Sequence, residues 1–223
     1  MVKRRIKLVI FDMDGLMFDT EKLGIAGWHY ALKTLGIPMP NKDLFLRKLG
    51  LNTNDSRSLM IKELGQGFEY DKAKELKQIY VNSYIEKNGV PVKSGLFELL
   101  DYIDEIGLKK CIATSSSLEE TRFYISKSGI KTDFDELVTE ESVDEGKPSP
   151  KIFLKAAELL MIEPVCSLVL EDSPNGIKAA FYAEMLPVMI PDLILPDKAT
   201  QALIFAQFSS LFDVIGLLSD YME

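Results

Sequence analysis

The sequence predicts an α/β protein, a doubly wound and mostly parallel sheet that carries an inserted all-helical domain. Two observations predict this fold. From residue 88 onward, short apolar runs alternate with helical patterns, which is typical of a parallel sheet with helices on both faces. One more apolar run, Leu8 to Phe11, comes earlier, and residues 17–87 between the two regions show only helical spacing. Because Leu8 to Phe11 must belong to the same sheet, residues 17–87 are expected to be an insertion after the first strand.

The expected strands are short apolar runs bounded by turn residues. Leu8 to Phe11 has apolar side chains at every position, as a strand buried on both faces requires. The later runs share this character and are separated by segments with helical spacing. The strands expected are residues 8–11, 110–114, 137–139, 167–170 and 186–190.

The inserted unit is expected to hold four helices. Apolar residues within 23–30 share a helical face, and Gly36-Ile37-Pro38 is typical of a helix end. Asn41 and Asn54 are expected to cap the second and third helices, and residues 76–84 fit a fourth. The domains predicted are a core of residues 1–16 and 88–223 and a helical domain of residues 17–87.

The composition excludes several classes of partner. The chain has 223 residues, 47% hydrophobic and 27% charged, which is ordinary for a globular protein. Its net charge is −8 and no basic block interleaves with aromatic residues, so no nucleic-acid partner is expected. No signal peptide and no membrane-spanning stretch is recognised, so we expect no membrane partner and a cytoplasmic location. We expect a monomer, although no motif specifies the oligomeric state.

The cysteines and the histidine do not indicate a site of their own. Cys111 and Cys166 form neither a disulfide framework nor a zinc-binding spacing, which favours a reducing compartment and a packing role. The single histidine, His29, lies within a helical pattern far from other candidate residues. It is expected to be a cap or surface residue, and a Ser/His/Asp hydrolase is not indicated.

Two carboxylates follow the first strand directly. Asp12 and Asp14 are two residues apart and precede Gly15, so their side chains point the same way along an extended chain. Open α/β sheets keep their sites at the carboxyl edge of the strands. Two close carboxylates are unfavourable unless a cation or proton offsets them, which favours a hard metal ion and an anionic ligand. The alternative is an exposed Asp-Gly turn.

A second strand end carries hydroxyl groups. Thr114 and Ser115 begin a run that continues to Ser117, and Ser117 with Glu120 fits a capping box at the start of a helix. Hydroxyls and free backbone N–H groups at a helix N-terminus can bind an anion. By itself, such a run is more often an ordinary helix cap.

Two further segments complete the pattern. Lys147 precedes a helix that Ser149 would cap, with Pro150 at its first position, and a lysine there can neutralise phosphate charge. Glu171 and Asp172 end another buried strand, and Mg²⁺ needs only a few carboxylate ligands because it keeps several waters. Taken separately, these residues could be a solvated loop lysine and a helix cap.

The four segments in this order resemble the haloacid dehalogenase-like hydrolase superfamily, in its branch of phosphatases and β-phosphoglucomutases with a helical C1-type cap. The resemblance rests on Asp12-x-Asp14-Gly15 with its Asp-Thr-Glu continuation at 19–21, and on the segment Leu-Glu-Asp-Ser-x-x-Gly-Ile-x-Ala-Ala at 170–180. It implies a Rossmann-like core, with residues 17–87 as the cap domain.

The resemblance also implies roles for individual residues. Asp12 would be the nucleophile and Asp14 the acid and base, while Lys147 would offset charge on the phosphate and on Asp12. A metal site for Mg²⁺ would use Asp12, the Asp14 carbonyl and Asp172. The remaining roles implied are phosphate binding by Thr114 and Ser115 and assistance at the metal by Glu171.

The implied function is hydrolysis of a small phosphorylated metabolite, such as a sugar or polyol phosphate, through an aspartyl phosphate. The alternative within the family is a β-phosphoglucomutase. Those enzymes carry a cap histidine and a cap-loop arginine, where this chain has Gly24 and Thr53, so hydrolysis is favoured. A receiver-type phosphorylation switch also combines acids, a hydroxyl and a lysine, but the chain length, the helical insert and Asp14 oppose it.

Overall fold

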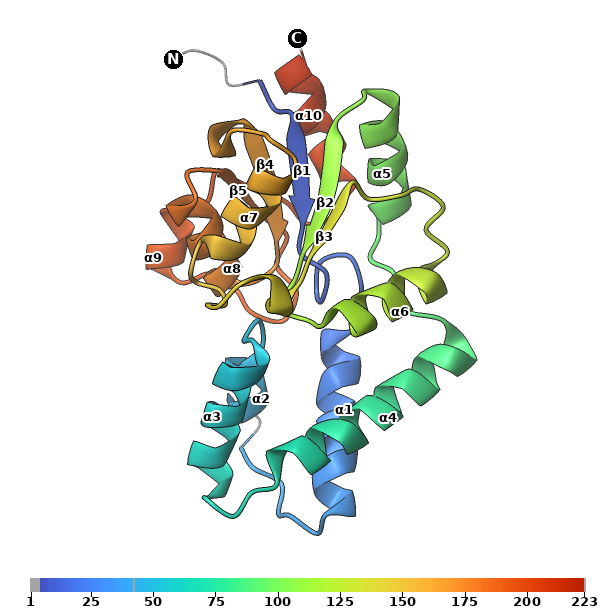
Figure 1. Cartoon of the computed structure of the whole chain (residues 1–223), viewed down its shortest axis with the longest axis vertical. Helices are drawn as coiled ribbons and strands as arrows, with labels where there is room; N and C mark the ends of the chain where they lie inside the picture. The colour runs from blue at the N-terminus through green and yellow to red at the C-terminus, as the bar shows by residue number, and fades with distance from the viewer. Residues whose placement is uncertain (1–4, 42, 223) are drawn as a thin grey trace.

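The protein contains a six-stranded sheet of parallel strands, seen in a computed structural model that describes residues 5–41 and 43–222 (Figure 1). The strand order is β3-β2-β1-β4-β5-β6. The chain therefore runs outward from β1 in both directions, and such a reversal of strand order creates a crevice at the carboxyl edge. The predicted fold class is confirmed. The strands are β1 (Leu8–Phe11), β2 (Lys109–Ala113), β3 (Glu136–Val138), β4 (Ser167–Glu171), β5 (Leu186–Met189) and β6 (Ala206–Gln207).

All five predicted strands form, and no strand end differs from its predicted position by more than one residue. The sixth, β6, pairs with β5 at Val188 and Met189. It has only two residues, and such a short segment offers no alternating pattern to detect. It forms because the edge of β5 supplies hydrogen-bond partners.

Helices cover both faces of the sheet, because alternate residues of each buried strand point in opposite directions. Val9 and Phe11 of β1 pack into a core with helices α5, α6 and α10. Leu8 and Ile10 pack on the other face with α7 and α8. These helices are α5 (Leu96–Glu105), α6 (Leu118–Ser128), α7 (Lys151–Leu159), α8 (Pro174–Tyr182) and α10 (Asp213–Met222); α9 (Lys198–Gln201) and the short 3-10 helices Glu140–Ser142 and Pro164–Cys166 complete the core.

The insertion forms four helices beyond the carboxyl edge of the sheet (Figure 1). They pack around a hydrophobic core of their own that includes Trp28, Phe45 and Met60. Helices α1 and α4 contact one another most extensively and lie side by side in Figure 1. The predicted division of the chain at residues 16–17 and 87–88 stays a prediction. The four helices are α1 (Glu21–Thr34), α2 (Asp43–Lys48), α3 (Thr53–Leu64) and α4 (Tyr70–Asn88).

Two predicted helix caps were wrong by one or two residues. Asn52, and not Asn54, caps α3, because its side chain accepts a hydrogen bond from the backbone N–H of Asp55. Pro150 occupies the cap position of α7 in place of Ser149. Asn52 and Asn54 carry the same side chain, and Ser149 and Pro150 are neighbours in the chain. The backbone angles therefore decide which residue takes each cap position.

The predicted cap at Ser117 is confirmed in part. Its hydroxyl accepts a hydrogen bond from the backbone N–H of Glu120. The side chain of Glu120 instead bonds Tyr124, so the reciprocal half of the capping box is not made. Cys111 is buried, as a packing role requires, and Cys166 is half-buried. His29 lies edge-on to Phe45.

Within the described part of the chain, none of the helices combines the length and the apolar composition that crossing a membrane would require.

Candidate active site

A buried lysine connects three strand ends at the carboxyl edge of the sheet. The ammonium of Lys147 donates hydrogen bonds to Asp12 Oδ1 at 2.5 Å, Glu171 Oε1 at 2.6 Å and the Ala113 carbonyl at 3.1 Å. The backbone N–H of Asp12 in turn donates to the Leu170 carbonyl at 3.0 Å, which holds Asp12 beside β4. An ammonium has three donors. All three are used within the protein, so in this conformation Lys147 holds Asp12 in place and has no donor left for a ligand.

Three carboxylates lie together around that lysine. One oxygen each from Asp12, Glu171 and Asp172 lies within 4.8 Å of the others, and all three residues are buried. Burial, and then the neighbouring acids, raises the pKa of Asp172 well above its usual value. Burial also raises the pKa of Asp12, although Lys147 opposes this shift. Burial disfavours the charge of Lys147, but Asp12 and Glu171 raise its pKa.

The acidic cluster of Asp12, Glu171 and Asp172 fits a hard divalent cation. Its donors are carboxylate oxygens, which Mg²⁺ prefers, and buried like charges need a counter-ion. The two oxygens of Glu171 are already bonded, Oε1 to Lys147 and Oε2 to the backbone N–H and hydroxyl of Ser173. Asp12 and Asp172 therefore offer the free carboxylate positions, and Glu171 orients its neighbours.

Two glycines allow the close packing of this cluster. Gly15 has a φ of +85°, and a Cβ added there would collide with the carboxylate of Asp172. A Cβ at Gly176 would likewise collide with the carboxylate of Glu171. Both recognised motifs therefore need glycine at these positions, because a carboxylate lies where the side chain of any other residue would begin.

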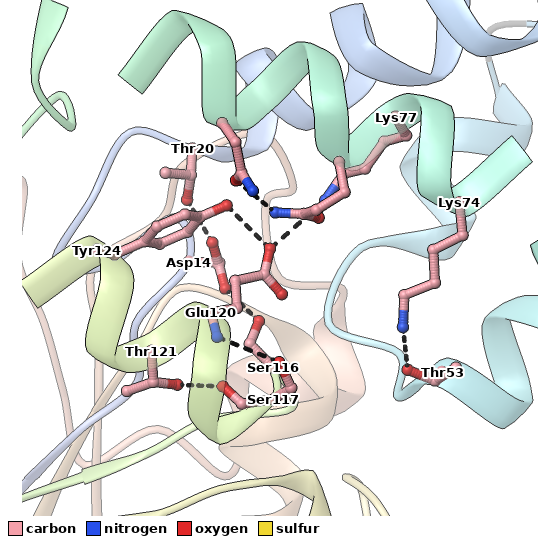
Figure 2. A network of polar contacts seen from close by, with 12 residues as sticks. Asp14, Thr20, Thr53, Lys74, Lys77, Ser116, Ser117, Glu120, Thr121 and Tyr124 are labelled. Atoms are coloured by element: carbon pink, nitrogen blue, oxygen red, sulfur yellow. Dashed lines mark hydrogen bonds and ion pairs between the residues drawn. The ribbon is translucent and has the colours of Figure 1, made fainter. Parts of the chain in front are cut away.

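Asp14 lies outside the acidic cluster and has hydroxyl partners instead (Figure 2). Its carboxylate accepts hydrogen bonds from Thr20 Oγ1 and from Ser116 Oγ, the latter at 2.7 Å. Burial and the charge of Glu120 raise its pKa, while the two hydroxyls act in the opposite direction. A carboxyl group with a raised pKa is suited to proton transfer. The predicted metal contact of Asp14 through its carbonyl stays a prediction.

A pocket of about 130 Å³ lies between the carboxyl edge of the sheet and the helices of the insertion. Asp12, Asp14, Asp172, Thr114 and Ser115 line its floor, so the structure brings these predicted residues together. Lys147 and Glu171 are not among the lining residues, because they lie buried beneath the carboxylates. The roof comes from the insertion, through Glu21, Gly24, Ile25, Trp28, Phe45, Lys48, Leu49, Gly50, Leu51, Thr53, Ser56, Tyr70, Lys74 and Lys77.

One polar network joins the roof to the floor of the pocket (Figure 2). Glu120 of α6 lies 3.6 Å from the ammonium of Lys77 on α4 and accepts a hydrogen bond from the Tyr124 hydroxyl at 2.9 Å. Burial opposes the charge of Glu120, but Lys77 and Tyr124 keep its pKa below the usual value. Glu120 is therefore an ionised and paired carboxylate.

A second contact closes the pocket on another side. The backbone N–H and the hydroxyl of Thr53 donate to the two carboxylate oxygens of Glu140, at 3.0 and 2.8 Å. Lys74 donates to the Thr53 hydroxyl at 2.9 Å (Figure 2). Thr53 and Lys74 belong to the insertion and Glu140 follows β3. We call Thr53, Lys74 and Glu140 the closing contact.

Glu21 and Lys48 are charged lining residues without a partner among the residues that the structure describes. No described residue makes a hydrogen bond or ion pair with either side chain; the Lys48 ammonium lies 4.9 Å from the centre of the Trp28 ring. Burial, followed by Asp14, raises the pKa of Glu21 to about 7. Burial, followed by Lys77, lowers the pKa of Lys48 to about 8.

The prediction from sequence missed several residues of this site. Thr20 and Ser116 stand inside motifs that were recognised, and their hydroxyls could have been considered as partners of Asp14. Lys77 carries no local signal, since it is an ordinary charged residue of a helix, and Glu120 was expected only as part of a helix cap. Only the folded chain brings them together.

The chain matches the family model of the haloacid dehalogenase-like hydrolases over residues 9–190. A phosphorylated carbohydrates phosphatase of Thermotoga maritima is 29% identical over 180 residues, which are 78% of this chain and 80% of that protein. Hexitol phosphatase B of Escherichia coli is 28% identical over 189 residues, or 84% of this chain and 85% of that protein. The crystal structure of a β-phosphoglucomutase from Clostridium difficile aligns with a TM-score of 0.81 at 22% identity, covering 97% of each chain.

Proposed function

Because the chain belongs to the haloacid dehalogenase-like hydrolase family, we propose that it is a Mg²⁺-dependent phosphatase acting on a small phosphomonoester, such as a sugar or polyol phosphate. The observation that carries the proposal is the position of Asp12, which Lys147 holds at 2.5 Å on the floor of a pocket. A carboxylate nucleophile divides hydrolysis into two easier steps. Membership of a hydrolase family also argues against a receiver-type switch.

In the first step, a carboxylate oxygen of Asp12 attacks phosphorus and the bond between phosphorus and the ester oxygen breaks. Asp14 gives its proton to the leaving oxygen, so an alcohol departs and an aspartyl phosphate remains on Asp12. In the second step, Asp14 takes a proton from water as the water oxygen attacks phosphorus. The bond between phosphorus and Asp12 breaks, which releases phosphate and restores both side chains.

The other floor residues would bind and neutralise the phosphoryl group. Thr114 and Ser115 would donate hydrogen bonds to its oxygens from the end of β2. Lys147 contributes a fixed positive charge next to Asp12, although its three donors are used within the protein. Asp12 and Asp172, with the Asp14 carbonyl and with Glu171 assisting, would hold Mg²⁺, which when bound would neutralise phosphate charge.

The helical insertion would act as the cap that excludes water and contacts the leaving group. Among the described residues that line the pocket there is no histidine and no arginine. Gly24 and Thr53, which the resemblance puts in the place of the mutases' cap histidine and cap-loop arginine, both line this pocket. Without them, the pocket has fewer cations to retain a bisphosphate, which favours hydrolysis over phosphoryl transfer back to a sugar.

The proposal is tested by measuring phosphate release from a panel of phosphorylated metabolites with Mg²⁺. We expect steady turnover on p-nitrophenyl phosphate and faster turnover on a sugar or polyol phosphate. The panel includes β-glucose 1-phosphate with its bisphosphate activator. Isomerisation faster than phosphate release would replace the phosphatase with a mutase, and labelling without turnover would exclude both.

Removal of Mg²⁺ is expected to abolish turnover, because the acidic cluster would then be left without its counter-ion. The measurement is phosphate release after chelation and after Mg²⁺ is restored. A second readout is the rise in Tm when Mg²⁺ binds the folded protein. The substitution Asp172→Asn should remove this rise, and Asp220→Asn on the exposed face of α10 should retain it. Full activity in the chelator would contradict the proposal.

Loosening the closing contact is expected to raise KM. In Glu140→Gln, the charge is lost and one of the two acceptor oxygens becomes an NH₂ group, so the two charge-assisted hydrogen bonds to Thr53 are weakened. A hydrogen bond to a charged group contributes about 1.5–3 kcal/mol, and a less populated closed state weakens binding in proportion. We expect KM to rise about tenfold or more and kcat to change less. The matched control is Glu145→Gln, an exposed partner of Lys151. An unchanged KM would show that Glu140 does not control closure.

A further inference from the structure

Besides Asp12, Asp14 and Asp172, six charged side chains line the pocket, three lysines and three glutamates. Lys77 pairs with Glu120 at 3.6 Å. Lys74 and Glu140 share the hydroxyl of Thr53. The two side chains left over are Glu21 and Lys48, which have opposite charges and no partner among the described residues. The formal charges of these six side chains therefore cancel, and Glu21 and Lys48 offer one acceptor and one donor that no described residue uses.

One face of α1 presents these groups. Glu21, Gly24, Ile25 and Trp28 all line the pocket, and their spacing places them on the same side of a helix. A Cβ at Gly24 would meet only the Cε of Lys77, at 3.9 Å, so the space beside this face is open. Trp28 lies under the ammonium of Lys48, and this cation–π contact orients the charge.

We infer that this α1 face, Glu21 with Lys48, is a specificity site for an uncharged leaving group with several hydroxyls. The inference rests on the proposed phosphatase activity. A hydroxyl is both donor and acceptor, so neighbouring hydroxyls satisfy the Glu21 carboxylate and the Lys48 ammonium at once. A leaving group with a second anionic group would satisfy Lys48 but would face the carboxylate of Glu21. An alkyl chain would leave both side chains unpaired in a partly desolvated pocket.

The test compares leaving groups of equal length in the full-length enzyme with Mg²⁺. Sorbitol 6-phosphate carries hydroxyls, n-hexyl phosphate carries none, 6-phosphogluconate adds a carboxylate, and p-nitrophenyl phosphate measures the chemistry itself. We expect kcat/KM to be highest for sorbitol 6-phosphate. Lys48→Met and Glu21→Gln should each lower that value about 10- to 100-fold, the loss expected for a hydrogen bond to a charged group. Turnover of p-nitrophenyl phosphate, whose leaving group carries no hydroxyls, should fall much less than turnover of sorbitol 6-phosphate.

The control Lys62→Met removes an exposed lysine from α3 and should leave all four values unchanged. A preference for 6-phosphogluconate or n-hexyl phosphate would overturn the inference, as would a loss in Lys48→Met no larger than in Lys62→Met. These failures are distinct from a failure of the proposed function, because p-nitrophenyl phosphate would still be hydrolysed. If no phosphate ester were hydrolysed by the unmodified enzyme, the phosphatase itself would be excluded.

Discussion

Asp12→Asn is expected to lower kcat by at least about 10³-fold, because a carboxamide oxygen does not form the acyl phosphate that the carboxylate forms. The side chain keeps its shape, and Lys147 keeps its bonds to Glu171 and Ala113. The fold should therefore survive the change. The measurement is phosphate release together with mass analysis of acid-quenched enzyme, in which unmodified protein should carry a phosphoryl group on the peptide that contains Asp12.

The matched control is Asp101→Asn, the same change at an exposed position of α5. It should keep full turnover and the same trapped phosphoryl group. If Asp12→Asn kept more than about a tenth of the activity, or if the phosphoryl group were found on another residue, Asp12 would not be the nucleophile. Circular dichroism of both variants separates a loss of chemistry from a loss of fold.

Asp14→Asn is expected to lower kcat about 10²–10⁴-fold on alkyl phosphates, the range of general acid–base catalysis. An alkoxide leaves poorly without a proton, whereas nitrophenolate leaves without one. The first step on p-nitrophenyl phosphate should therefore be slowed far less than the second, in which Asp14 accepts a proton from water. Stopped-flow measurement should show a burst of nitrophenolate close to the enzyme concentration, followed by slow turnover.

The dependence on the leaving group distinguishes proton transfer from a structural effect. A variant that only disturbed the pocket would slow alkyl and nitrophenyl esters equally and would give no burst. Such a result would exclude Asp14 as the acid and base. Asp101→Asn again serves as the control, with neither a burst nor a slower rate expected.

Much of the floor of the site could be predicted from the sequence, because each part is local. A buried strand ends at Asp12, and another ends at Glu171 and Asp172. Parallel strands bring their carboxyl ends to one edge, so the strand pattern by itself implies that these residues meet. The structure brings Asp12, Asp14, Thr114 and Ser115 to one pocket and Lys147 beneath it.

The partners within the site could not be predicted in this way. Lys147 donates all three hydrogen bonds within the protein only because β1, β2 and β4 lie side by side. The helix caps at Asn52 and Pro150 depended on backbone angles that several neighbouring residues could have adopted. The strand β6 formed only because the edge of β5 was available.

By itself, the sequence determined the class of fold and the chemical groups at each strand end, since hydrophobic period and turn residues act over a few positions. The tertiary structure alone decided which charges are paired. Thr53 and Glu140 are hydrogen-bonded although 87 residues separate them in the sequence. Lys77 of the insertion likewise forms an ion pair with Glu120 across the pocket. Hydrogen bonds and ion pairs are short-range contacts, so pairing across the pocket depends on how the insertion packs on the sheet. In this packing no described residue pairs with Glu21 or Lys48.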